Sequence, residues 1–190
     1  MLDVPGFALA LAALGRPGAV VIYPTETVYG LGGRASDRAS ALRIAAIKGR
    51  PPGGLIVLAL EPPLPGGLAR RLASAFWPGP LTLVVPAWPG LPDEVLGPDG
   101  TVAVRPPLHP VARALVQVVG PITSTSANAS GAPPLVNPGL ARLPVDAIID
   151  VGLLPFSPPS TVVRADTGEI LREGAIPREA LARVLGELLP

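Results

Sequence analysis

Short apolar runs alternate along this chain with segments of helical character, and this alternation limits the folds that the chain can adopt. Two of the runs, 19–23 and 55–60, contain no charged residue. Continuous apolar runs of this length are typical of buried strands. A helical segment, 68–76, separates the second run from the next one. The pattern predicts an α/β or α+β fold, in which helices flank a twisted open sheet of mixed strand direction.

The other elements are predicted from turn residues, helix caps and apolar spacing. The predicted strands are 19–23, 55–60, 81–85, 102–104, 122–125, 147–151, 160–164 and 170–172. The predicted helices are 6–15, one that Ser36 or Asp37 caps and Gly49 ends, 68–76, 110–119 and one that Pro177 opens. Segment 24–35 is expected to be a loop. The residues expected to share one helix face are Leu42, Ala45 and Ala46, and in the last helix Leu181, Val184, Leu185 and Leu188.

Length and composition narrow the class of protein. With 190 residues and no internal boundary, the chain is expected to form one domain over residues 1–190. A net charge of +1 provides no general basic field, so an anion would need a local cluster of cations. The absence of cysteine excludes disulfides, thiolate metal sites and a thiol nucleophile. No apolar run reaches the roughly 18 residues of a membrane span, so we expect a soluble, cytoplasmic protein.

Polar side chains follow several of the predicted strands, where ligands of α/β sheets usually bind. These side chains are Thr25, Glu26 and Thr27, then Arg105, then Ser126 and Asn128, and finally Ser160 and Thr161. Each group has a simple alternative, since hydroxyls commonly form turns or caps and an arginine can form a surface ion pair. Taken together, with little opposing carboxylate, they predict a pocket for an anionic small molecule.

Lys48 is the only lysine, and every other basic residue apart from one histidine is arginine. It stands two residues before Arg50, at the predicted end of a helix. A compact ammonium next to a forked guanidinium is a suitable pair for binding an anion. The alternative is a solvated helix end, because cations are favoured at helix C-termini.

Several common catalytic arrangements are missing. His109, the only histidine, precedes Pro110 and is expected to be a cap or a surface residue. There is no Ser/His/Asp set, no histidine-rich metal set and no phosphate-binding P-loop, and the glycines at 30–33 do not match the dinucleotide fingerprint. Any catalysis is therefore expected to depend on positioning and charge stabilisation.

Seven segments occur in a recognisable order: YPTETVYGLG (23–32), KGRP (48–51), FWPGPLTL (76–83), TVAVRP (101–106), STSANASG (124–131), PSTVV (159–163) and ILREG (170–174). Over roughly residues 5–175, the chain closely resembles the YrdC-like family of threonylcarbamoyl-AMP synthases. The resemblance implies a YrdC-like fold with a large basic cavity. It also implies the short bacterial form, which lacks the extra C-terminal domain of longer members.

The resemblance implies a reaction as well. L-Threonine, bicarbonate or CO2, and ATP would give threonylcarbamoyl-AMP and pyrophosphate, which makes the protein a nucleotidyltransferase. Mg²⁺ would be bound through the ATP phosphates rather than by a metal site of the protein. The product would be used by a separate transferase complex to form N6-threonylcarbamoyladenosine at position 37 of tRNA. Contact with tRNA itself is a further expectation.

Site residues are implied by the same resemblance. The expected catalytic residues, which neutralise phosphate charge or bind the nucleotide and the reacting carbonyl, are Lys48, Arg50, Ser126 and Asn128. The expected ATP-binding residues are Lys48, Arg50, Thr101, Asn128 and Arg172. The expected threonine-binding residues are Thr27, Arg105, Ser126 and Ser160, with Arg105 on the carboxylate.

One segment departs from the family pattern. Many relatives have a longer polar link after KGRP and a histidine at the position where Leu58 stands here, whereas segment 52–54 is shorter by one residue. This departure leaves open a divergent paralogue that binds nucleotide or RNA in the same cavity without turnover. A protein that only supports the tRNA-modifying assembly is another alternative.

Overall fold

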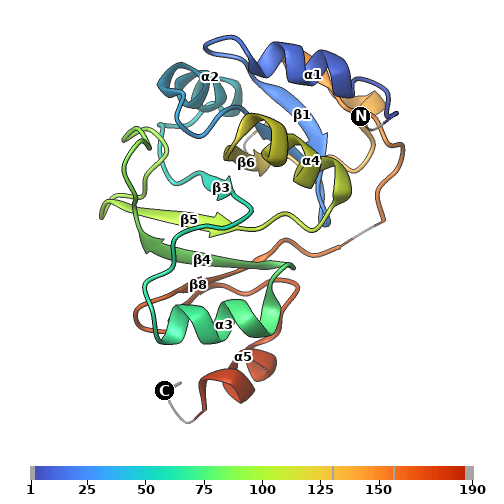
Figure 1. The fold of residues 1–190 in the computed structure, drawn as a ribbon. Coiled ribbons are helices and arrows are strands. Elements are labelled where there is room, and N and C mark those ends of the chain that lie inside the picture. The colour runs from blue at the N-terminus through green and yellow to red at the C-terminus, as the bar shows by residue number, and fades with distance from the viewer. Residues whose placement is uncertain (1–2, 130, 156, 187–190) are drawn as a thin grey trace.

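A mixed nine-stranded sheet organises the residues that the computed structural model describes, which are 3–129, 131–155 and 157–186 (Figure 1). The strands are β1 (Val21–Pro24), β2 (Tyr29–Gly32), β3 (Ile56–Leu58), β4 (Leu81–Pro86), β5 (Thr101–Arg105), β6 (Ile122–Ser126), β7 (Ala147–Ile148), β8 (Thr161–Arg164) and β9 (Ile170–Arg172). Their order across the sheet is β7-β1-β2-β6-β3-β5-β4-β8-β9. Parallel and antiparallel pairs alternate irregularly, as the predicted mixed sheet requires.

Helices cover both faces of this sheet. They are α1 (Phe7–Leu14), α2 (Arg38–Lys48), α3 (Leu68–Phe76), α4 (Pro110–Val119) and α5 (Arg178–Leu185), with a short 3-10 helix at Pro138–Leu140. Val57 belongs to the core under α2, α3 and α5, whereas its neighbour Leu58 belongs to the core under α1 and α4. Because successive strand residues point to opposite faces, the two cores lie on opposite sides of the sheet. Figure 1 shows α1 and α4 over one end of the sheet and α3 with α5 at the other.

The face under α1 and α4 is only partly covered. Farther along it, Thr101 and Ala103 of β5 and Val84 of β4 remain half-buried. Their sequence neighbours Val102 and Val104, on the opposite face, are at most 1% exposed. The sheet therefore keeps one strip of accessible surface, on the face of β5 that also carries Arg105. We call this strip the open face.

The predicted loop at 24–35 is wrong, since Tyr29–Gly32 forms β2, which pairs with β1 and β6. The ring of Tyr23 lies against Gly30, and its hydroxyl crosses β2 to donate a hydrogen bond of 2.7 Å to the Thr123 carbonyl. A Cβ on Gly32 would come within 1.8 Å of that same carbonyl oxygen. These glycines make room for the tyrosine, and they also remove the apolar alternation by which a strand is predicted.

Two helix caps agree with the predictions. Asp37 accepts hydrogen bonds from the first turn of α2, and Nδ1 of His109 accepts one of 3.2 Å from the Val111 amide at the start of α4. Each satisfies backbone donors that the helix leaves unpaired. His109 is thus a cap, as expected.

The predicted helix faces need one correction. α2 buries Ala41, Ile44 and Ala45, while Leu42 and Ala46 are exposed, so the predicted face was rotated. α5 buries Leu181 and Leu185 as predicted. Leu188 lies outside the described residues.

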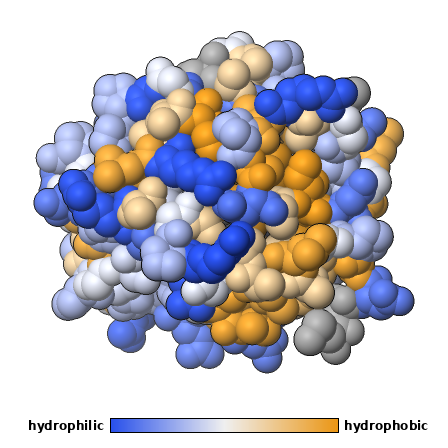
Figure 2. Space-filling model, turned by 90° about the horizontal axis from the view of Figure 1, so that it is seen from above, coloured by the Kyte–Doolittle hydropathy of each residue, from blue (hydrophilic) through white to orange (hydrophobic). Residues whose placement is uncertain are grey.

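α1 is apolar on both of its sides. It buries Phe7, Ala10 and Leu14 but leaves Leu9 70% exposed. Seen from above, hydrophobic residues gather in the centre and right of the surface (Figure 2). No described helix is long and apolar enough to cross a membrane.

Replacing Gly32 with alanine is expected to lower the free energy of unfolding by about 3 kcal/mol, because the added Cβ would overlap a backbone oxygen that cannot move away. Chemical denaturation followed by circular dichroism measures this change. Gly66→Ala is the control, since a Cβ there meets nothing within 4 Å and is expected to be nearly neutral. Equal stability of the two variants would contradict the close approach at Gly32.

Candidate active site

Lys48, the last residue of α2, binds the segment that follows β6. Its Nζ lies 2.8 Å from the Ser126 carbonyl, 2.8 Å from the Asn128 carbonyl and 2.9 Å from Asn128 Oδ1. Ser126 Oγ is farther away, at 3.4 Å. An ammonium group has three hydrogens, so the three short contacts occupy all of its donors. We call these three residues the Lys48 cluster.

The surroundings of Lys48 lower the pKa of its side chain. Burial, and then the positive charge of Arg50, lower the pKa of the Lys48 ammonium to about 8. The oxygens around Nζ oppose this effect, because they stabilise the charged form. The side chain is positioned by the end of the helix, where Gly49 adopts a left-handed conformation with φ of 65°.

Asn128 also shapes its own segment. Its Nδ2 donates a hydrogen bond to the Ala132 carbonyl, while its backbone amide donates one of 2.9 Å to the Ser126 carbonyl. Ala127 between them is buried and donates to the Tyr29 carbonyl of β2. The predicted grouping of Lys48, Ser126 and Asn128 is therefore present, with the lysine holding the loop that carries the other two.

Arg50 differs from Lys48. It is exposed, and its guanidinium has no hydrogen-bond or ion-pair partner among the residues that the structure describes. It lies two residues beyond α2 and within electrostatic range of Lys48. Arg50 is therefore a cation next to the Lys48 cluster with its donors available.

Arg105, at the end of β5, is buried with a carboxylate. Its Nη1 lies 3.0 Å from Oε1 of Glu26, and the two side chains are 4% and 10% exposed. Glu26 Oε2 accepts a hydrogen bond of 3.3 Å from the Leu108 amide. The expectation of little opposing carboxylate is wrong at this position. Arg105 does form an ion pair, but the pair is buried rather than on the surface.

A second arginine lies close to Arg105. Nη2 of Arg172 donates to the Ser160 carbonyl at 2.8 Å and to Ser160 Oγ at 3.2 Å. Ser160 Oγ in turn shares a hydrogen bond of 2.8 Å with the hydroxyl of Thr82. Partial burial of the guanidinium, and then the charge of Arg105, lower the pKa of Arg172 from its ordinary value. We call Arg105, Glu26, Ser160, Arg172 and Thr82 the Arg105 cluster.

The strand register relates the two clusters. Ile56 of β3 pairs with Ala103 on one side and with Ser124 on the other, so these residues share a face. Since strand residues two apart point to the same side, Thr101, Arg105 and Ser126 lie on that face as well. The Lys48 cluster thus adjoins one end of the open face, and Arg105 lies at the opposite end of β5.

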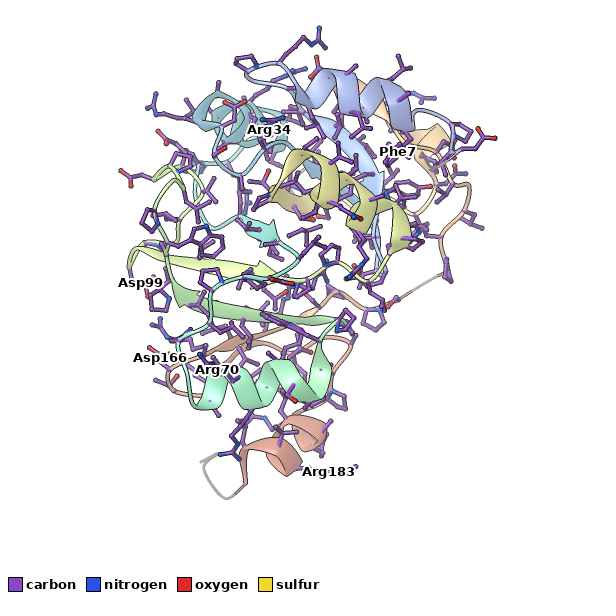
Figure 3. The ribbon with its side chains drawn as sticks, viewed as in Figure 1. Phe7, Arg34, Arg70, Asp99, Asp166 and Arg183 are labelled. Atoms are coloured by element: carbon purple, nitrogen blue, oxygen red, sulfur yellow. The ribbon has the colours of Figure 1, made fainter. Side chains whose placement is uncertain are left out.

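A cavity of about 470 Å³ opens on this face. Its lining residues are Gly54, Val84, Gly97, Pro98, Asp99, Thr101, Ala103, Arg164 and Leu171. Thr101 donates a hydrogen bond of 2.6 Å to Asp99, and Arg164 forms ion pairs with Asp99 and Asp166. Figure 3 shows Asp99 and Asp166 at the same edge of the molecule. Most of the lining residues are therefore apolar, and the two charged ones, Asp99 and Arg164, are paired with each other.

Thr27 lies in the turn between β1 and β2. Its hydroxyl is 3.2 Å from that of Thr25, which also contacts the Val28 carbonyl and amide. The alternative of a hydroxyl that forms a turn is therefore correct for Thr25. Thr27 is buried and directly follows Glu26, but no hydrogen bond joins its hydroxyl to the Arg105 cluster among the described residues.

Thr82, Asp99 and Arg164 were not predicted as site residues, and Glu26 was predicted only as one of the polar residues that follow the first strand. Thr82 had a signal, because it is a single polar residue inside an apolar run. No group of three histidine, cysteine or acidic side chains in the described part of the chain is placed to hold a metal ion. Binding of Mg²⁺ through a nucleotide's phosphates stays a prediction.

The chain has relatives over nearly all of its length. The model of the Sua5/YciO/YrdC family, which carries the description "Telomere recombination", matches residues 14–174. A threonylcarbamoyl-AMP synthase of Coxiella burnetii is 37% identical over an alignment that covers 83% of this chain and 91% of the relative.

Solved structures agree with this assignment. Pyrococcus abyssi Sua5, in a complex with L-threonine, superposes with a TM-score of 0.81 at 35% identity, covering 95% of this chain but 56% of that one. Escherichia coli YciO superposes with a TM-score of 0.79 at 28% identity, covering 94% and 95% of the two chains. The fold and the sequence together show that the chain belongs to the Sua5/YciO/YrdC family.

Proposed function

We propose that this protein is an L-threonylcarbamoyladenylate synthase, a nucleotidyltransferase that makes threonylcarbamoyl-AMP and pyrophosphate from L-threonine, bicarbonate or CO2, and ATP. Relatives at 37–40% identity are named threonylcarbamoyl-AMP synthase, which supports the proposal. The observation that carries it is the placement of two cationic clusters at opposite ends of the open face of the sheet, a face on which a cavity also opens.

The chemistry needs positioned charge more than an activated side chain. The threonine amine combines with bicarbonate to give a carbamate and water. A carbamate oxygen then attacks the α-phosphorus of ATP, the bond to the β-phosphate oxygen breaks, and pyrophosphate leaves. Mg²⁺ bound to the triphosphate would neutralise part of its charge. Fixed cations and amides that meet the developing charge contribute the remainder of the stabilisation.

The Lys48 cluster would bind the phosphate end of the reactants. Because the Lys48 donors are occupied by Ser126 and Asn128, the lysine acts by holding that loop and by its positive charge. Arg50, whose donors are available, is the better candidate for direct contact with phosphate oxygens. Thr101, at the wall of the cavity, would contact the nucleotide, and Arg172 would contact its phosphates from the Arg105 cluster.

The Arg105 cluster would bind the amino acid. Arg105 would receive the threonine carboxylate, while the hydroxyls of Ser160 and Thr27 would contact the rest of the amino acid. Leu58, which takes the position of a histidine in many relatives, pairs with Arg105 in register and is fully buried in the core under α1 and α4. We place the enzyme in the cytoplasm as one domain over residues 1–190. There it would supply a separate transferase complex that modifies position 37 of tRNA, and it would contact tRNA directly.

The purified protein, given ATP, L-threonine, bicarbonate and Mg²⁺, is expected to release pyrophosphate only when threonine is present. A coupled pyrophosphate assay measures this release, and mass spectrometry identifies the threonylcarbamoyl adenylate. A folded sample without threonine-dependent release would overturn the proposal. Nucleotide or RNA binding with a steep salt dependence but no turnover would favour the divergent paralogue instead.

Two single substitutions are expected to separate the two ends of the site. Lys48→Ala should weaken ATP binding by about 10–100-fold, since it removes a buried charge and releases the Ser126–Asn128 loop. Arg105→Ala should instead weaken threonine binding to a similar extent. Calorimetric titration of each variant with ATP and with threonine measures both, and loss of the same ligand in both variants would contradict the assignment.

ATP affinity is expected to fall as the pH rises through about 8. Below that pKa the Lys48 side chain carries its charge, and above it the neutral amine attracts phosphate less and loses a hydrogen for its oxygen partners. The chain has no other lysine and no cysteine, so few other groups titrate in this range. Titrations with ATP between about pH 7 and pH 9.5 check this. Lys48→Ala, the control, should show a flat profile; a flat profile in the unmodified protein would contradict the prediction.

A further inference from the structure

The Arg105 guanidinium is bound on one edge only. Its Nη1 forms an ion pair of 3.0 Å with Oε1 of Glu26, but neither that oxygen nor the buried Nε has a hydrogen-bond partner among the described residues. In the planar guanidinium, the Nε hydrogen points away from Nη1 and runs parallel to a hydrogen of Nη2, so these two donors form a separate edge. A buried donor without an acceptor is costly, by about 1–3 kcal/mol. The edge formed by Nε and Nη2 is therefore available for a ligand.

That edge has the geometry of a carboxylate site. Two parallel N–H donors of an arginine match the two oxygens of a carboxylate. The nearby charges agree, because Arg105 and Arg172 carry two positive charges while Glu26 carries one negative charge. The net charge of the three side chains is therefore positive, and one further negative charge would neutralise it.

Glu26 determines how that edge is oriented. The glutamate comes from the turn between β1 and β2, and its second oxygen accepts the Leu108 amide, three residues beyond Arg105. The Glu26 side chain is thus held at its base by the β1–β2 turn and at its carboxylate by the Leu108 amide. A carboxylate held in this way places its negative charge next to Nη1 and leaves the Nε edge uncovered.

We propose that Glu26 is a positioning residue for the amino-acid substrate: by binding Nη1 of Arg105, it presents the Nε edge to the substrate's α-carboxylate. This inference rests on the proposed function, since it assigns the carboxylate to threonine. Glu26 does not touch the substrate and acts through Arg105. Its effect therefore falls on amino-acid binding and leaves ATP binding unchanged.

The test compares Glu26→Gln, which removes the charge, with Glu26→Asp, which keeps it. Glu26→Gln is expected to raise KM for threonine about tenfold while KM for ATP changes less than about twofold. It should also reduce the preference for L-threonine over L-threoninamide, which lacks the carboxylate, in calorimetric titrations. Glu26→Asp should restore part of both. Glu94→Gln, which breaks the Glu94–Arg38 pair outside the Arg105 cluster, is the control and should behave as the unmodified protein does.

Several results would overturn the inference. A lower KM for threonine in Glu26→Gln would mean that Glu26 competes with the substrate, and an unchanged KM would mean that it has no part in binding. An equal loss of ATP and threonine affinity would mean a purely structural role. If Glu26→Gln fails to fold, Glu26→Asp decides the question, and a change in its threoninamide discrimination that comes only with a loss of ATP binding would mean the same. Threonine binding without pyrophosphate release in the unmodified protein would refute the proposed synthase alone, because the binding comparison still decides the role of Glu26. Absence of threonine binding in the unmodified protein would refute both.

Discussion

The burial of a single ammonium group underlies the geometry of this site. A lysine side chain is rarely buried, because an unpaired charge loses its hydration. Here the oxygens of Ser126 and Asn128 replace the lost water, so the segment after β6 must adopt one shape for Lys48 to be accommodated at all. The loop, the end of α2 and the edge of the sheet therefore form as one unit. Arg50 follows the same helix end, so this arrangement also determines its position.

The same principle recurs at the other end of the open face with different chemistry. Arg105 is held by the carboxylate of Glu26, and Arg172 is held by the carbonyl and hydroxyl of Ser160. Each cation is oriented by protein groups before any substrate arrives, which reduces the reorganisation needed during the reaction. The two cations differ in the hydrogen-bond donors that remain available: those of Lys48 are all occupied, whereas the Nε edge of Arg105 is not.

Much of this could be predicted from the sequence, and the failures have identifiable causes. Helix caps such as Asp37 and His109 act on residues two or three positions away, so they can be recognised locally. β2 was missed because its glycines serve the ring of Tyr23, a requirement set by the tertiary structure. The ion pair of Glu26 with Arg105 joins segments far apart in the chain, and no local pattern indicates it. The grouping of Lys48 with Ser126 and Asn128 was expected from a family resemblance, not from spacing.

The way in which Nζ of Lys48 is surrounded also accounts for an oddity of composition. The chain uses arginine at every other position for a long cationic side chain, yet keeps lysine here. An ammonium is tetrahedral and directs its hydrogens as a tripod, which suits oxygens converging from a tight loop, whereas a guanidinium is flat and broad and directs its hydrogens within one plane. A drift in codon usage from lysine to arginine would be tolerated wherever charge alone matters, and would be selected against where three acceptors close around a point.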